Sequence, residues 1–151
     1  MKVLYTAFNG KNNSSKVLLD KISVKDKLYL KNSFITSVKE LENKILTENY
    51  DLIISFGQAP LDCDTIKIET IGSCEIKYKT NYDYSNLMNK LDSKGYKVII
   101  SNNAGNYLCN NLYYKGLKII NEKQINTKMI FIHIPKIKNI SNIDNLANVF
   151  D

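Results

Sequence analysis

The chain contains no arginine, and all 21 of its basic residues are lysines. Arginine contacts phosphate or guanine through two parallel hydrogen bonds, so its absence removes that mode of nucleic-acid recognition. The formal net charge is +6, but the lysines are spread along the whole sequence. A nucleic-acid interface would gather them on one face among aromatic side chains. We therefore interpret the lysines as a solvated surface and expect no nucleic-acid partner.

The chain also has little that could bind a metal or form disulfides. It contains one histidine and three cysteines, Cys63, Cys74 and Cys109, without a CxxC spacing. The odd number argues against a disulfide framework, and the spacing argues against a zinc site. No clustered set of carboxylates accompanies the histidine. We expect no metal and no cofactor.

Long hydrophobic runs are absent, because no apolar stretch approaches the roughly 18 residues of a membrane-spanning helix. The apolar run at residues 1–8 is too short for a signal peptide and predicts a first strand. We therefore expect no membrane partner and a cytoplasmic location. With 44% hydrophobic residues, the chain can bury a core without disulfides, and its length predicts one domain over residues 1–151.

Predicted strands and helices mostly alternate along the chain, which indicates an α/β layered fold with a largely parallel sheet. Helix starts are expected at Ser14 or Ser15, at Ser37, where Glu40 completes a capping box, and at Asp83. The predicted strands cover residues 2–7, 27–34, 51–55, 65–71, 96–100 and 129–135. The predicted helices cover residues 16–23, 38–46, the segment between Asp83 and Gly95, 112–120 and 141–149.

A small, polar, glycine-containing turn ends in a thiol. The stretch Ser101–Asn110 follows a predicted buried strand and leads into a predicted helix, with Cys109 near the helix start. A helix N-terminus supplies unpaired N–H groups and partial positive charge, which favour a thiolate. Because the thiolate is the nucleophilic form of cysteine, Cys109 is a candidate for covalent catalysis.

The only histidine, His133, lies in an apolar, β-branched run that ends at Pro135. This pattern predicts a strand with His133 near its C-terminal end. One helix and a return connection would fit between Cys109 and His133. We therefore expect the thiol and the imidazole to lie at the same carboxyl edge of the sheet, on neighbouring strands.

Four blocks of the chain resemble segments of the pyroglutamyl-peptidase I (pyrrolidone-carboxylate peptidase) family, and they occur in the same order as in that family. The first strand, residues 3–8, is also similar to that of the family, and the resemblance covers roughly residues 2–137. The block around Cys109 is the most specific of the four. The blocks are Asp51–Ala59, Ile66–Glu69, Ser101–Asn110 and Phe131–Pro135.

The resemblance implies a three-layer α/β/α sandwich around a mixed, largely parallel sheet. It also implies a cysteine peptidase that removes an N-terminal pyroglutamyl (5-oxoproline) residue from peptides through a Cys–His–Glu triad and a thioester. The family's triad maps to Cys109, His133 and Glu69, and its lactam pocket maps to Phe8 and Gln58. Members commonly assemble into dimers or tetramers, so a homodimer or homotetramer is expected.

Two other functions are compatible with the sequence. A divergent member of the same family would act on a different amide or bind a ligand without turnover. An unrelated basic interaction module would bind partners through its lysines. Hydrolysis of a pyroglutamyl amide separates the peptidase from the first alternative, and salt-dependent nucleic-acid binding would indicate the second.

Overall fold

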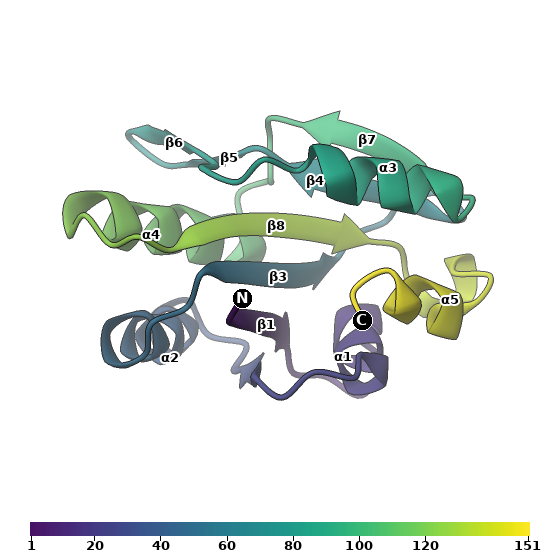
Figure 1. Ribbon diagram of the computed structural model, residues 1–151, viewed down its shortest axis with the longest axis horizontal. Helices are drawn as coiled ribbons and strands as arrows, with labels where there is room; N and C mark the ends of the chain where they lie inside the picture. Colours follow the sequence, from purple (N-terminus) through teal and green to yellow (C-terminus); the bar gives the residue numbers. More distant parts are fainter.

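A six-stranded mixed sheet forms the centre of the molecule (Figure 1). The computed structural model describes all residues from 1 to 151. The strands are β1 (Val3–Phe8), β2 (Lys27–Leu30), β3 (Leu52–Gln58), β4 (Thr65–Glu69), β7 (Lys97–Ser101) and β8 (Lys128–Ile134). Their order across the sheet is β2-β1-β3-β8-β4-β7. The first four in that order are parallel, whereas β4 and β7 run together in the opposite direction.

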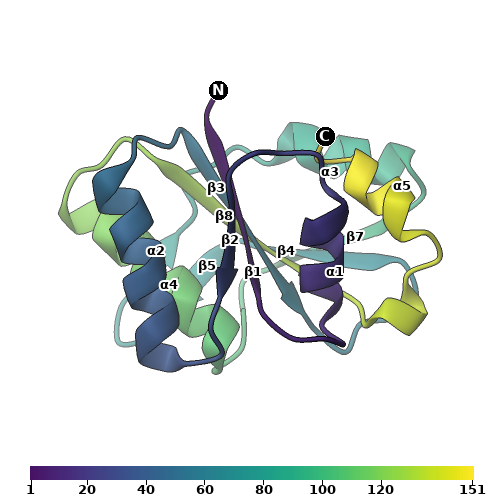
Figure 2. The ribbon, with the colours of Figure 1, turned by 90° about the horizontal axis from the view of Figure 1, so that it is seen from below.

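Helices cover both faces of this sheet and create three layers (Figure 2). The helices are α1 (Ser14–Lys21), α2 (Phe34–Thr47), α3 (Ser85–Ser93), α4 (Leu108–Glu122) and α5 (Ile143–Asn148), with a 3-10 turn at Ile137–Asn139. Leucines of α1, α3 and α5 pack in one apolar cluster, and those of α2 and α4 pack in the other. The predicted α/β fold class is confirmed.

Strand β8 divides its side chains between the two faces because successive residues of a strand point in opposite directions. Ile130, Ile132 and Ile134 belong to the cluster under α1, α3 and α5. Met129 and Phe131 belong to the cluster under α2 and α4. His133 continues this second row, so the imidazole lies on the face that α2 and α4 cover.

A short hairpin, β5 (Ile71–Ser73) and β6 (Lys77–Lys79), follows β4 and was not predicted. It packs beside α4, where the Tyr78 and Tyr114 rings lie 5.6 Å apart. A Cβ at Gly72 would lie 2.7 Å from the backbone nitrogen of Tyr114, so only glycine allows this approach. Each strand of this hairpin has only three residues, which is too short to show a clear alternation in the sequence.

The predicted helix starts differ from the observed ones. Asn13, rather than Ser14 or Ser15, caps α1, and Ser33, rather than Ser37, caps α2. Helix α2 therefore begins within the predicted 27–34 strand, which ends early at Leu30. The prediction of Asp83 as the cap of α3 is also wrong, because Tyr84 occupies the cap position, although Asp83 accepts hydrogen bonds from the backbone N–H and the hydroxyl of Ser85.

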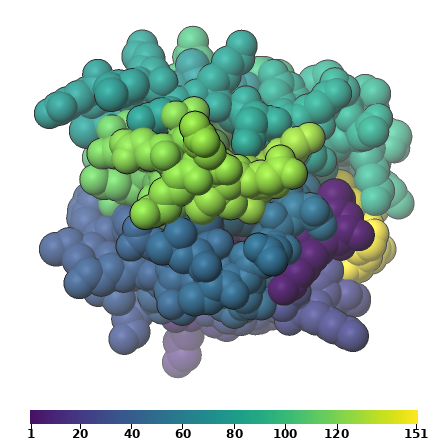
Figure 3. Space-filling view, turned by 60° about the vertical axis from the view of Figure 1, so that its left-hand side comes forward, coloured from purple at the N-terminus to yellow at the C-terminus, as the bar shows by residue number.

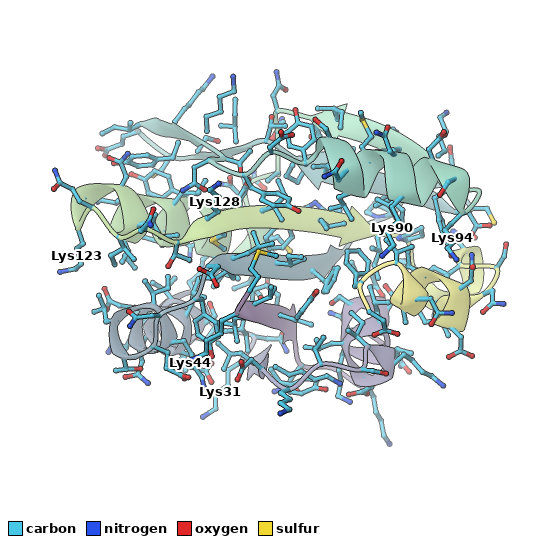
Figure 4. All side chains as sticks on the ribbon, in the orientation of Figure 1. Lys31, Lys44, Lys90, Lys94, Lys123 and Lys128 are labelled. Carbon is cyan, nitrogen blue, oxygen red and sulfur yellow. The ribbon has the colours of Figure 1, made fainter.

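Lysine side chains extend from several elements of the molecule (Figure 4). In Figure 3 the light-green segment that joins α4 to β8 lies between teal segments above it and blue segments below it.

None of the five helices is long and apolar enough to cross a membrane.

Candidate active site

A buried hydrogen bond between two side chains joins β8 to β4. Nδ1 of His133 lies 2.7 Å from Oε2 of Glu69. Glu69 is directly opposite Phe131 in the antiparallel pair, and His133 is two residues further along β8. The two side chains are therefore diagonal neighbours on one face of the sheet. With Nδ1–H donating to the carboxylate, Nε2 of the neutral ring is left as a proton acceptor.

The Glu69 carboxylate is enclosed, with only 1% of the residue exposed, against 7% for His133. Its Oε1 has no hydrogen-bond partner. Its backbone oxygen accepts a hydrogen bond of 2.8 Å from the Tyr113 hydroxyl, which fixes the end of β4 against α4. The His133 imidazole is thus the only side chain that hydrogen-bonds to this buried carboxylate.

Cys109 is the second residue of α4 and directs its sulfur toward the end of β3. A Cβ built on Gly57 would lie 2.6 Å from Sγ of Cys109 and 2.9 Å from the Phe131 ring. Gly57 is also the register partner of His133 on the adjacent strand. The sulfur thus lies against the backbone of the residue beside His133, and the absence of a side chain at Gly57 leaves room for it.

No hydrogen bond joins the thiol of Cys109 to the imidazole of His133, and Gly57, which lies against the sulfur and is the register partner of His133, relates the two. In enzymes without substrate, catalytic hydrogen bonds are often long and tighten when substrate binds. The arrangement therefore has a thiol, an imidazole and a carboxylate on one side of the sheet.

Burial, and to a smaller extent the negative charge of Glu69, raise the pKa of the Cys109 thiol to about 12. The expectation that the helix N-terminus alone would favour a thiolate is therefore wrong for this environment. Desolvation and a nearby negative charge both oppose ionisation of a thiol. The resting sulfur is a neutral thiol that needs a base to become nucleophilic.

The route by which the chain reaches this site also differs from the prediction. Strand β7, which precedes the Cys109 turn, does not neighbour β8, because β4 lies between them. Since β7 is antiparallel to β8, the two strands do not end at the same edge of the sheet. The loop at residues 102–107 connects the end of β7 to the start of α4. Gly105, with φ +90°, adopts a left-handed conformation there.

Asn110 is a site residue that the sequence analysis did not single out. Its Oδ1 accepts a 3.0 Å hydrogen bond from the backbone N–H of Ser73, and its Nδ2 donates a 2.7 Å hydrogen bond to the Ser73 oxygen. The side chain thus binds the β5–β6 hairpin as a neighbouring strand would. Because Asn110 directly follows Cys109, these two hydrogen bonds connect the start of α4 to the segment after Glu69. Its place in the Ser101–Asn110 block was the only signal.

The two predicted pocket residues lie at the carboxyl ends of β1 and β3. Phe8 is buried in the apolar cluster under α2 and α4. Gln58 is partly exposed, and its Oε1 accepts a 2.9 Å hydrogen bond from the backbone N–H of Ser14. Because that donor requires an oxygen, the amide orientation is defined, and Nε2 remains free.

The other two cysteines, Cys63 and Cys74, are exposed and outside this site. No group of three or more histidine, cysteine, aspartate or glutamate side chains is arranged to hold a metal ion.

The fold closely matches solved structures of pyroglutamyl peptidases. A single-site variant of pyrrolidone carboxyl peptidase from Pyrococcus furiosus superimposes with a TM-score of 0.85 at 22% identity, covering 99% of this chain and 94% of that one. Pyroglutamyl peptidase I from Bacillus amyloliquefaciens gives a TM-score of 0.80 at 19% identity, covering 99% and 90%. At these identities the likeness establishes a common fold.

Sequence similarity is higher to other pyrrolidone-carboxylate peptidases. The protein of that name from Thermosipho melanesiensis is 32% identical over 168 residues, covering 89% of this chain and 83% of that protein. The one from Clostridium botulinum is 29% identical over 169 residues, covering 91% and 79%. The pyroglutamyl peptidase family as a whole matches residues 62–148, more than half of the chain. The chain therefore belongs to the pyroglutamyl peptidase family of cysteine-type peptidases.

Proposed function

We propose that this protein removes the N-terminal pyroglutamyl residue from peptides, with Cys109 as nucleophile, His133 as general base and acid, and Glu69 as the group that orients His133. The observation that carries the proposal is the buried His133–Glu69 pair beside the sulfur of Cys109, with Gly57 as the common neighbour.

In the first half of the reaction, Nε2 of His133 accepts the thiol proton while the sulfur of Cys109 attacks the carbonyl carbon of the pyroglutamyl residue. The tetrahedral intermediate then collapses, and the carbon–nitrogen bond to the rest of the peptide breaks. The protonated His133 gives its proton to the leaving amine. The products are a thioester on Cys109 and a peptide shortened by one residue. A base is required because burial raises the pKa of the thiol.

In the second half, His133 accepts a proton from water, which attacks the thioester carbonyl. The carbon–sulfur bond breaks, pyroglutamate leaves, and the proton returns to Cys109. Glu69 stabilises the imidazolium in both halves because it is buried within 2.7 Å of Nδ1.

Backbone N–H groups at the start of α4 are the donors available to the oxyanion. Tyr107, which precedes the first turn, makes no side-chain hydrogen bond to it. The first N–H groups of a helix have no partner inside the helix. One donor of this type contributes about 2.7–4 kcal/mol to transition-state stabilisation in other hydrolases.

Recognition of the lactam ring is assigned to Gln58 and Phe8. The lactam presents a carbonyl acceptor and an N–H donor on one edge of an otherwise apolar ring. The free Nε2 of Gln58 is suited to donate to that carbonyl, since Ser14 already holds Oε1. Phe8 lies at the neighbouring strand end, where its ring is buried in the apolar cluster under α2 and α4.

A pyroglutamyl chromogenic amide tests the proposal directly. We expect turnover by the native chain and none by Cys109→Ser, with unchanged circular dichroism of the variant as the control for folding. We also expect 2-pyrrolidone to protect Cys109 from iodoacetamide, because it occupies the lactam pocket. Protection without turnover would indicate a binding role in place of hydrolysis, and absence of both would contradict the proposal.

A further inference from the structure

The loop between β1 and α1 contains the only Asn-Gly sequence of the chain, Asn9-Gly10. In such a sequence the backbone nitrogen of the glycine can attack the carbonyl carbon of the asparagine side chain and close a succinimide ring. A Cβ on the following residue hinders this approach, and glycine has none. Asn-Gly is therefore the sequence in which asparagine loses its amide most readily.

Both reacting groups of this pair are free. The Asn9 side chain is exposed and makes no hydrogen bond, since only the backbone of Asn9 is engaged, by Leu30 and Asn32. The N–H of Gly10 donates to no acceptor. Gly10 lies outside the helices and strands, with φ +152°. No hydrogen bond thus holds the nucleophilic nitrogen or the side-chain carbonyl away from the other.

Three other asparagines precede a serine or an alanine, and each uses its side chain in a hydrogen bond. Oδ1 of Asn13 accepts from the N–H of Ser15, and Nδ2 of Asn32 donates to the Asn9 oxygen. Oδ1 of Asn103 accepts from the N–H of Gly105. These bonds restrain the side chains, so we expect the three asparagines to react more slowly than Asn9.

We propose that Asn9 is a site of spontaneous deamidation, which converts it to aspartate and isoaspartate and loosens the loop beside Gln58. In the first step the Gly10 nitrogen loses its proton and bonds to Cγ of Asn9, the bond from Cγ to the amide nitrogen breaks, and ammonia leaves. Water then opens the succinimide. Cleavage between Cγ and the Gly10 nitrogen gives aspartate. Cleavage at the backbone carbonyl gives isoaspartate, in which the main chain runs through Cγ.

The loop is fixed at both ends to the carboxyl edge of the sheet, beside the residues assigned to the lactam. Asn9 directly follows Phe8, and its N–H donates a 2.8 Å hydrogen bond to the Leu30 oxygen. At the other end, the N–H of Ser14 donates to Oε1 of Gln58. Isoaspartate adds one main-chain carbon between these fixed ends, so the loop must shift, and the hydrogen bond that orients Gln58 weakens. The effect on the lactam pocket rests on the proposed function.

Ageing of the purified chain tests the modification without any measurement of activity. After incubation at pH 8, we expect mass spectrometry of the peptides to show conversion of Asn9 ahead of Asn13, Asn32 and Asn103. An isoaspartyl methyltransferase should label the aged chain at residue 9. Asn9→Gln is the matched variant, because ring closure through the longer side chain is much slower, and it should gain no label in this loop. Conversion of Asn9 no faster than that of the other three would overturn the inference.

Turnover of a pyroglutamyl amide by the fresh and the aged chain measures the effect on the pocket. We expect KM to rise by about two- to tenfold with conversion, equivalent to the loss of one hydrogen bond, and kcat to change less. Aged Asn9→Gln should keep the KM of its fresh sample. An unchanged KM in the converted chain would overturn the effect on the pocket. No turnover by the fresh chain would contradict the proposed function, and the mass measurement would still decide whether Asn9 deamidates.

Discussion

The two faces of strand β8 pack against different helices and carry different kinds of side chain. One face presents Ile130, Ile132 and Ile134 to the helices α1, α3 and α5. The other begins with Met129 and Phe131 and then changes to His133, which is paired with Glu69. The first face stabilises the sheet through continuous apolar packing. The second ends in a buried polar pair at the position where chemistry is proposed.

The largest expected effect comes from breaking the polar pair. Glu69→Gln leaves His133 without an anionic partner, so we expect kcat on a pyroglutamyl amide to fall by about 10³- to 10⁴-fold, as for other triad acids. Steady-state kinetics measure this loss. A fall of less than tenfold would remove Glu69 from the proposed mechanism.

The same variant should make the free thiol more reactive toward alkylation. The negative charge of Glu69 raises the pKa of Cys109 beyond the effect of burial. Removing that charge lowers the pKa and increases the thiolate fraction at a given pH. We expect iodoacetamide to react with Cys109 faster at pH 8 in the variant than in the native chain, while turnover falls. Slower alkylation would contradict the electrostatic coupling.

A smaller effect is expected from filling the space under the sulfur. Gly57→Ala would bring a methyl group to 2.6 Å from Sγ of Cys109, so the thiol must move. A displacement of about 1 Å can cost 10²-fold in rate, and we expect a loss of that order in kcat. Gly116→Ala is the matched control, because its methyl group meets the flexible Met129 side chain. If kcat falls equally in both variants, displacement of the Cys109 sulfur is not the cause of the loss in Gly57→Ala.

A still smaller effect is expected from removing the Asn110 side chain, which binds the β5–β6 hairpin. Asn110→Ala removes two hydrogen bonds to the backbone of Ser73. We expect a loss of about 1–3 kcal/mol in the free energy of unfolding, because buried polar groups of the hairpin lose their partner. Denaturant titration measures it. Ser73→Ala keeps both hydrogen bonds, since they use the Ser73 backbone, and should leave stability nearly unchanged.

The smallest effect is expected on the apolar face of β8. Ile132→Val removes one methylene from a fully buried side chain. We expect a loss of about 0.5–1.5 kcal/mol in the free energy of unfolding, with kcat unchanged. Thermal denaturation and turnover, measured on the same sample, separate the two quantities. A selective loss of kcat would mean that the two faces are not independent.

Strands that are buried on both faces were predicted well. Each is a continuous run of apolar residues, which can be recognised in the sequence without knowing the strands that pair with it. The predicted segments at 51–55 and 129–135 correspond to β3 and β8. The hairpin at β5 and β6 was missed, since its stability comes from Asn110 and α4 rather than from its own sequence. The start of α2 at Phe34 has a local origin, because the Ser33 side chain caps the helix by accepting a hydrogen bond from the N–H of Thr36.

The sequence by itself determined the fold class and the membership of the family, and it placed Cys109, His133 and Glu69 in recognisable segments. These properties depend on local pattern and on motif order. Only the tertiary structure decided that β4 separates β7 from β8 and that Glu69 reaches His133. It also decided that burial raises the pKa of Cys109. Strand order, diagonal contacts and desolvation arise between segments far apart in the chain, so no local pattern contains them.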